Sequence, residues 1–220
     1  VSHVDVDKIA FTGSTEVGAH VAALAGKHLK PVTAELGGNA PNILFADADL
    51  RTAVHTVISA FVFNTGQFCM AGPRLLVERP IYDVVLGILA DAVPQVPFGD
   101  PANPETVIGP LASRNQLDKV SALVDRAKAA GARVITGGEK VDLGGGFYFQ
   151  PTVLADLPAD AEAVAEEVFG PVLTVQPFDT EDEAIALANS TRYGLASGIQ
   201  TTNLAKAHRV AARLHAGITW

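Results

Sequence analysis

The sequence predicts an α/β fold in which short strands alternate with amphipathic helices. Strand-like runs such as residues 8–11 and 42–45 are each followed by a helix-like run, and this alternation is typical of α/β proteins. With 220 residues, of which 48% are hydrophobic and 18% charged, the chain is long enough for one large domain or for one and a half.

Apolar runs bounded by turn residues locate the strands. The expected strands cover residues 8–11, 31–35, 42–45, 74–78, 133–135 and 172–178, with a further segment at 147–154 and a strand starting at residue 217. Residues 94–110 are rich in Pro, Gly, Asn and Asp, so they are expected to form a long loop.

Helical periodicity and capping residues locate the helices. The expected helices cover residues 15–25, 50–63, 82–93, 115–130, 180–189 and 203–214. In residues 50–63 the apolar side chains recur at helical spacing. Gly131 is suited to end the fourth helix, and Thr180 with Glu183 has the form of a capping box for the fifth.

Composition excludes several classes of function. The net charge of −8 comes from interspersed acids and bases, so no nucleic-acid partner is expected. No apolar run approaches the roughly 20 residues that a membrane span needs, and the start of the chain has no signal-peptide pattern. A single cysteine excludes an internal disulfide and fits a reducing compartment, so a cytoplasmic location is expected.

Both ends of the chain run directly into strand-like sequence. The first residue is Val1 rather than Met, and residues 217–220 read as the start of a strand. We therefore expect the chain to be a piece of a longer protein.

Cys69 is the only cysteine and the most informative single residue. It follows an apolar helical run and lies near Gly66, where a thiol can be presented rather than packed. Free cysteine is also among the most buried residue types. Its local sequence therefore leaves two interpretations open, a core filler and a catalytic nucleophile.

Residues 11–18 read as a strand, a tight glycine turn and a helix start. Unpaired N–H groups and the helix dipole at such a helix start suit a phosphate group. The run is not a GxGxxG fingerprint, and an ordinary turn with a Ser or Thr cap explains it equally well.

Glu35 ends an apolar strand and precedes the paired glycines Gly37 and Gly38. Active groups often lie where strands of α/β sheets end, and paired glycines let a ligand or another backbone approach closely. The alternative is a solvated carboxylate at a strand end.

Residues 166–172 contain two adjacent carboxylates, Glu166 and Glu167, followed by Phe169. The carboxylates repel each other, so one of them is expected to have a partner. A carboxylate can accept hydrogen bonds from both hydroxyls of a ribose, and an aromatic side chain can face a flat ring. The alternative is a helix end followed by a Gly-Pro break.

Taken together, these segments resemble the aldehyde dehydrogenase superfamily. The matching runs are residues 11–18, 35–42, 66–69, 166–172 and 191–198; they fall in the order of the family, and the resemblance covers the whole chain. Glu35 also precedes Cys69 by the spacing that the family pattern expects. Five motifs in register favour the functional interpretation of each segment.

The resemblance implies NAD(P)-dependent oxidation of an aldehyde to a carboxylic acid. Cys69 is implied as the nucleophile that forms a thiohemiacetal and then a thioester, and its backbone N–H as a donor to the oxyanion. Glu35 is implied as the base that activates water, a role that suits a carboxylate whose pKa is raised by partial burial. No metal is implied.

The resemblance also implies how NAD or NADP would bind. Thr12, Gly13 and Ser14 would meet the pyrophosphate, and Val17 the adenine side. Leu36 would pack near the nicotinamide. Glu167 would hold the nicotinamide ribose, with Phe169 beside the ring. The residues that discriminate NAD from NADP are expected upstream of this sequence.

The implied architecture is that of an aldehyde dehydrogenase-like α/β protein. Residues 1–37 would be a remnant of the Rossmann-like coenzyme domain, and residues 38–220 most of a three-layer catalytic domain. Most of the dinucleotide fold, a second oxyanion donor and the oligomerisation strand would lie outside, so the fragment alone is expected to be inactive. The parent protein is expected to be a homodimer or homotetramer.

Phe68 and Met70 flank the thiol and favour an apolar small-molecule aldehyde as substrate. Two other functions stay open. One is a coenzyme A-acylating relative, against which Glu35 argues, because those relatives lack this glutamate. The other is a non-catalytic α/β structural or binding module, against which the joint presence of Cys69 and Glu35 argues.

Overall fold

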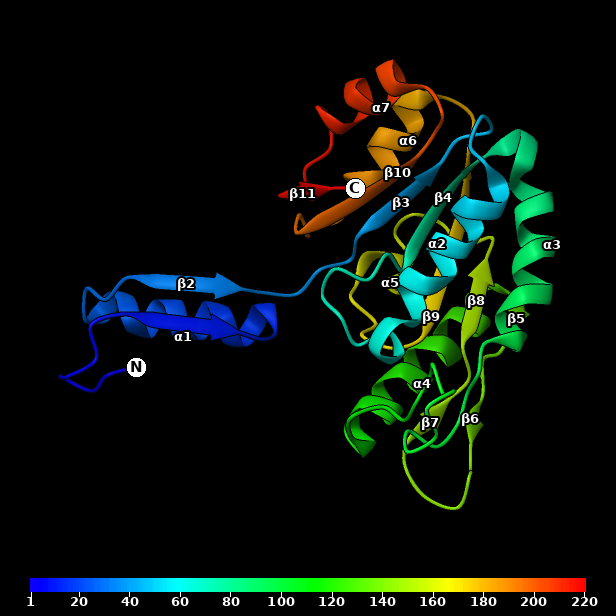
Figure 1. The fold of residues 1–220 in the computed structure, drawn as a ribbon. Helices are drawn as coiled ribbons and strands as arrows, with labels where there is room; N and C mark the ends of the chain where they lie inside the picture. Colours follow the sequence, from blue (N-terminus) through cyan, green and yellow to red (C-terminus); the bar gives the residue numbers. More distant parts are fainter. The chain divides into compact units, whose positions relative to one another are not determined.

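A computed structural model describes all residues of the chain, 1–220. Contacts divide it into two compact units, Val1–Gly38 and Asn39–Trp220, each with a sheet of its own (Figure 1). The assignment of these units to a coenzyme domain and a catalytic domain stays a prediction. No helix in the structure combines the length and apolar character that crossing a bilayer requires.

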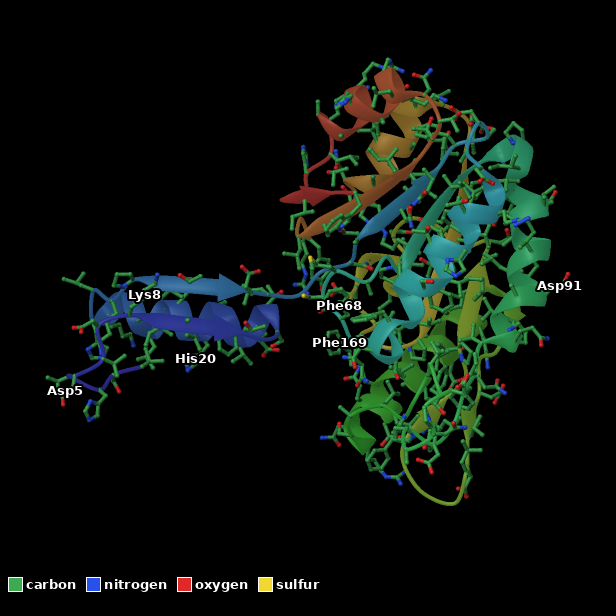
Figure 2. All side chains as sticks on the ribbon, in the orientation of Figure 1. Asp5, Lys8, His20, Phe68, Asp91 and Phe169 are labelled. Atoms are coloured by element: carbon green, nitrogen blue, oxygen red, sulfur yellow. The ribbon has the colours of Figure 1, made fainter.

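The first unit is a single strand–helix–strand motif. Strand β1 (Ile9–Thr12) and strand β2 (Val32–Glu35) are parallel, and helix α1 (Thr15–Lys27) connects them. Ser14 caps the helix by accepting a hydrogen bond from the Val17 N–H at 3.3 Å. His20, on this helix, is exposed to solvent (Figure 2).

The second unit is built on a seven-stranded sheet in the order β11-β10-β3-β4-β9-β8-β5. Its strands are β3 (Pro41–Leu44), β4 (Arg74–Glu78), β5 (Arg133–Thr136), β8 (Thr152–Ala155), β9 (Val172–Phe178), β10 (Ala196–Gln200) and β11 (Ile218–Thr219). Neighbouring strands are parallel except for the antiparallel pair β5 and β8. A separate antiparallel pair consists of β6 (Lys140–Val141) and β7 (Tyr148–Phe149).

Helices cover both faces of this sheet. They are α2 (Leu50–Val62), α3 (Tyr82–Ala92), α4 (Arg114–Ala129), α5 (Glu162–Ala165), α6 (Glu181–Ala188) and α7 (Leu204–Ala211), with short 3-10 turns at Phe63–Gly66, Arg79–Ile81 and Val93–Gln95. Helices α2 and α3 pack on one face, whereas α4, α5, α6 and α7 pack on the other. The second unit therefore has the expected three-layer α/β architecture.

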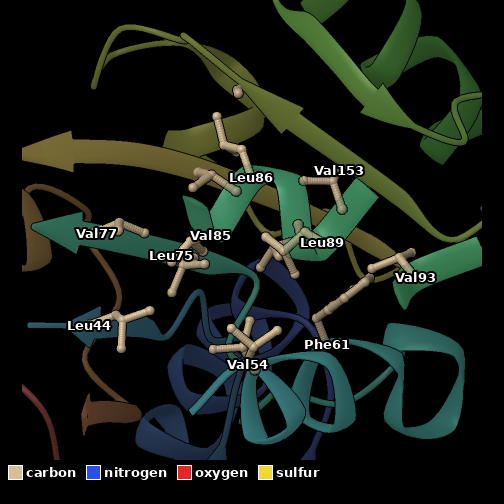
Figure 3. Packing of buried hydrophobic residues seen from close by; sticks show 14 of the residues in the cluster. Leu44, Val54, Phe61, Leu75, Val77, Val85, Leu86, Leu89, Val93 and Val153 are labelled. Carbon is tan, nitrogen blue, oxygen red and sulfur yellow. The ribbon is translucent and has the colours of Figure 1, made fainter. Parts of the chain in front are cut away.

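The largest apolar cluster lies between the sheet and helices α2 and α3 (Figure 3). In β4, Leu75 and Val77 point into this cluster while Leu76 joins the cluster on the opposite face. This alternation follows from the period of two along a strand, and a sheet covered on both faces buries both sets. Each fully buried side chain of this size contributes about 1.5–3 kcal/mol of transfer free energy.

The structure corrects several expected boundaries. Helix α7 ends before residue 214, and Asn203 is its cap because its side chain accepts from the Lys206 N–H. The segment at 147–154 is split into β7 and β8, since Pro151 has no N–H to donate to a ladder. The short helix α5, the strand β10 and the pair partner β6 were not predicted.

Candidate active site

Three segments converge at one edge of the large sheet. The loop that carries Cys69 leads into β4, Asn39 and Ala40 lead into β3, and residues 166–170 lead into β9. Since β3, β4 and β9 are adjacent and parallel, their amino ends lie at the same edge. In this unit the candidate groups therefore gather where strands begin.

The cysteine loop, residues 63–73, turns sharply before it reaches the thiol. Asn64, Thr65 and Gly66 all have left-handed backbone angles, with φ of 49°, 58° and 70°. Two consecutive non-glycine residues in this region are uncommon and carry strain. The Asn64 side chain donates to the Gln67 carbonyl at 2.9 Å, which stabilises the turn. Cys69 follows as a half-buried free thiol.

The cysteine loop packs directly against residues 166–170. A Cβ atom added at Gly66 would lie 2.1 Å from the carbonyl oxygen of Gly170. Only glycine permits this approach, and its φ of 70° independently favours glycine. Phe68 and Phe169 accordingly lie toward the same side of the second unit (Figure 2).

Residues 166–170 have no regular structure, and side chains hold their backbone. Gln116 of helix α4 donates to the carbonyls of Val168 and Phe169 at 3.1 and 2.7 Å. Lys119, one turn further along α4, donates to the Glu167 carbonyl at 3.2 Å. Phe169 has a left-handed φ of 55° and a ring-bearing side chain that is 37% exposed. The segment thus presents an aromatic side chain from a strained, tightly held backbone.

Glu166 has the partner that the adjacent carboxylates were expected to require. Its carboxylate accepts from the Arg192 guanidinium at 2.8 Å and from the Tyr193 hydroxyl at 3.1 Å. The same Tyr193 hydroxyl accepts from the Glu167 N–H at 3.4 Å. Tyr193 therefore contacts both glutamates, through the carboxylate of Glu166 and through the backbone N–H of Glu167.

A buried cation, Arg74, lies at the start of β4 directly after the cysteine loop. It is 1% exposed, and its guanidinium donates to the Leu187 and Ala188 carbonyls at the end of α6 and to the Ser190 hydroxyl. Acceptors at a helix C-terminus suit a cation. Burial lowers the pKa of Arg74 to about 10. The guanidinium also reaches the carbonyl of Asn39 at 3.5 Å.

Asn39 completes the contacts at this sheet edge. Its side-chain amide is 2% exposed and donates to the carbonyls of Val164 and Glu166 at 2.8 and 3.3 Å. Arg74 and Asn39 together connect the start of β4, the start of β3 and the segment before β9.

In the first unit, Glu35 ends β2 beside the turn that ends β1. The Gly13 N–H donates to the Glu35 carbonyl at 3.1 Å, so the turn of Thr12, Gly13 and Ser14 lies next to this glutamate. The Glu35 side chain is exposed. Partial burial was expected for a water-activating carboxylate, and these 220 residues do not provide it.

The remaining predicted residues of this unit lie on or against α1. Val17 is 48% exposed in the first turn of the helix. Leu36 packs on the helix, because a Cβ atom at Gly18 would lie 2.2 Å from its Cδ2 atom. The turn and the exposed first helical turn leave room for a ligand with a phosphate group.

The sequence analysis gave no role to Asn39, Arg74, Gln116, Lys119 or Tyr193, although Asn39 and Tyr193 lie within the matched runs 35–42 and 191–198. Gln116 carried one signal, since Ser113 and Gln116 have the spacing of a capping box. Ser113 does accept from the Gln116 N–H at 3.2 Å, yet the Gln116 side chain bonds residues 168 and 169 instead. No group of three or more metal-ligating side chains occurs in the structure.

Comparison with known proteins identifies the family. The model of the aldehyde dehydrogenase family matches residues 1–220. An aldehyde dehydrogenase from Bacillus cereus, solved with NAD+, is 42% identical with a TM-score of 0.96 over 99% of this chain and 44% of that chain. An NAD-dependent aldehyde dehydrogenase from Sinorhizobium meliloti is 41% identical with a TM-score of 0.98 over 100% and 44%.

Aldehyde dehydrogenase C from Pseudomonas syringae, solved as a mutant with NAD+ and octanal, is 40% identical with a TM-score of 0.95 over 99% of this chain and 45% of that chain. The fold and the family match define an α/β protein of the aldehyde dehydrogenase type. The chain belongs to the aldehyde dehydrogenase family, and it spans less than half the length of these solved relatives.

Proposed function

We propose that these residues supply the thiol and the general base of an NAD(P)-dependent aldehyde dehydrogenase. The observation that carries the proposal is the close packing of the cysteine loop on residues 166–170, through Gly66 and Gly170. It joins a half-buried free thiol to a segment that presents a carboxylate and an aromatic ring.

In this proposal Cys69 acts as a thiolate. Its sulfur attacks the aldehyde carbon to give a thiohemiacetal, whose oxyanion accepts a hydrogen bond from the Cys69 N–H. Bound NAD(P)+ supplies the hydride acceptor, so that loss of hydride leaves a thioester on Cys69. Glu35 then takes a proton from water, and the hydroxide that forms hydrolyses the thioester, which releases a carboxylic acid and returns the Cys69 thiolate.

The residues that would hold the cofactor are those of two segments. Thr12, Gly13 and Ser14 would face the pyrophosphate at the start of α1, with Val17 toward the adenine. Leu36 would lie near the nicotinamide, Glu167 would bind the ribose, and Phe169 would lie beside the ring. NAD rather than NADP is favoured, because relatives at 41–42% identity are NAD-dependent or were solved with NAD+.

The substrate class follows from a cavity beside the cysteine loop. The cavity has a volume of ≈ 510 Å³, and its lining includes Phe63, Phe68, Met70, Trp220 and His55. Its mainly apolar walls favour an aldehyde with an aliphatic or aromatic chain. The octanal complex of the Pseudomonas syringae relative agrees with this preference.

The test uses a full-length enzyme that contains these 220 residues. Cys69→Ala should abolish NADH formation from octanal while NAD+ binding, measured by calorimetry, stays unchanged. NADH formation at the wild-type rate by Cys69→Ala would exclude the thiol mechanism. The isolated 220 residues should form no NADH, since they span less than half the length of the solved relatives.

Coenzyme A-acylating activity and a non-catalytic role are the alternatives. Glu35 disfavours the first, and the retained pair of Cys69 and Glu35 disfavours the second. Product analysis separates them, because the proposed enzyme releases a free carboxylic acid in the absence of coenzyme A. The full-length protein is proposed to be a cytoplasmic homodimer or homotetramer.

A further inference from the structure

Tyr193 lies at the junction of the two adjacent glutamates. Its hydroxyl donates to the Glu166 carboxylate at 3.1 Å and accepts from the Glu167 N–H at 3.4 Å. Arg192 donates to the same Glu166 oxygen at 2.8 Å and to the Tyr193 hydroxyl at 3.2 Å. One phenolic oxygen therefore connects the side chain of Glu166 to the backbone of Glu167.

The chain shortly before Tyr193 is held by the buried cation that follows the cysteine loop. Arg74 donates to Ser190 Oγ at 3.2 Å and to the Leu187 carbonyl at 2.6 Å. Only two residues, Thr191 and Arg192, separate Ser190 from Tyr193. The tyrosine is thus attached to a helix end that Arg74 fixes, and Arg74 directly follows the cysteine loop.

The segment that Tyr193 contacts depends on such side-chain contacts. Residues 166–169 form neither a helix nor a strand, so their N–H and C=O groups need partners from elsewhere. Asn39, Lys119 and Gln116 bind carbonyl groups of the segment. Tyr193 differs from these three because it binds the N–H of Glu167 and the carboxylate of Glu166. It therefore holds both glutamates at the start of the segment.

We propose that Tyr193 is a positioning residue for cofactor binding. Its hydroxyl holds the Glu167 N–H and the Glu166 carboxylate, and this contact keeps the segment from Glu167 to Phe169 in the conformation that binds the nicotinamide ribose. The inference rests on the proposed function, in which Glu167 binds that ribose. Tyr193 touches neither cofactor nor substrate in this role; it acts through the backbone of Glu167.

The test compares Tyr193→Phe with Tyr82→Phe in the full-length enzyme. Tyr82 is a matched control, because its hydroxyl also donates to a carboxylate, that of Asp156 at 3.0 Å. Asp156 follows the carboxyl end of β8, whereas residues 166–170 precede the amino end of β9, its parallel neighbour. The two tyrosines therefore probe opposite edges of one sheet with the same chemical change.

Two readouts separate positioning from general damage. Calorimetry gives the Kd for NAD+, and release of 4-nitrophenolate from 4-nitrophenyl acetate reports acylation of the Cys69 thiol without any cofactor. Tyr193→Phe should raise the Kd about tenfold, the size expected when a hydrogen bond to a charged group is lost. Ester acylation should stay within about twofold, since it does not use the ribose segment.

Glu166→Gln is a second variant, which removes the charge from the contact between Glu166 and Tyr193. It should also raise the Kd for NAD+. An unchanged Kd in both variants would overturn the proposal. Equal effects from Tyr193→Phe and Tyr82→Phe, or a parallel loss of ester acylation, would also overturn it. Failure of the proposed function looks different: the wild-type enzyme would then bind NAD+ yet form no NADH from any aldehyde.

Discussion

Gly66 lies so close to Gly170 that a Cβ atom on Gly66 would be 2.1 Å from the Gly170 carbonyl oxygen. The contact joins the loop of the thiol to the segment proposed to bind the ribose. Gly170 is confined as well, because a Cβ atom there would lie 2.6 Å from the Val120 side chain. A side chain at either glycine would therefore clash with a neighbouring segment.

Gly66→Ala should therefore destabilise the protein, by about 2–4 kcal/mol, through the clash with backbone and the left-handed φ. The midpoint of urea unfolding of the 220-residue chain measures the loss. Gly87→Ala is the matched control, since Gly87 is inside helix α3 and a Cβ atom there meets nothing within 4 Å. It should stabilise the protein by about 0.5–1 kcal/mol. Equal midpoints for both variants would contradict this account.

Arg74→Met should also be strongly destabilising. The change keeps much of the buried volume but leaves the carbonyls of Leu187 and Ala188 without their cationic donor. We expect a loss of about 3 kcal/mol in the free energy of unfolding. Arg126→Met is the control, because Arg126 forms an exposed ion pair with Glu162 and should matter much less. A larger effect at Arg126 than at Arg74 would contradict the structure.

Much of this fold could be predicted from the sequence. The sequence located β4 and β9 with their observed bounds, because both are mainly apolar runs between turn residues. The short helix α5 was missed, since its four residues are too few for a periodic pattern. Strands β10 and β6 carry small or charged residues and show no strand pattern of their own.

The candidate site was predictable only in part. Cys69 and Glu35 stand in recognisable motifs, but their chemistry depends on groups that are distant in sequence. Two contacts are long-range and are indicated by no local pattern. Tyr193 donates to the Glu166 carboxylate, and Arg74 donates to the Leu187 carbonyl at the C-terminal end of α6. Gln116 illustrates how tertiary contacts override a local pattern. The capping-box spacing predicts that its side chain binds the backbone of Ser113, whereas in the folded protein it binds the carbonyls of Val168 and Phe169.

Alkaline stability should report on Tyr82. Burial, followed by the hydrogen bond to Asp156, raises the pKa of Tyr82 from 10.0 to about 12. A raised pKa in the folded state stabilises the protein below the unfolded pKa, so this contribution is complete below pH 10 and is lost as the pH rises toward about 12. Unfolding midpoints over this range should fall more steeply for the wild type than for Tyr82→Phe. Identical slopes would contradict the assignment.

Cys69 and Glu35 are proposed to act in different steps, and rapid-mixing kinetics of Glu35→Gln in the full-length enzyme separate those steps. In the proposed mechanism, acylation of Cys69 does not require the glutamate, whereas hydrolysis of the thioester does. We expect a burst of about one NADH per active site, followed by slow turnover, with an acyl adduct on Cys69 detectable by mass spectrometry. Steady turnover at the wild-type rate, or the absence of both burst and adduct, would contradict it.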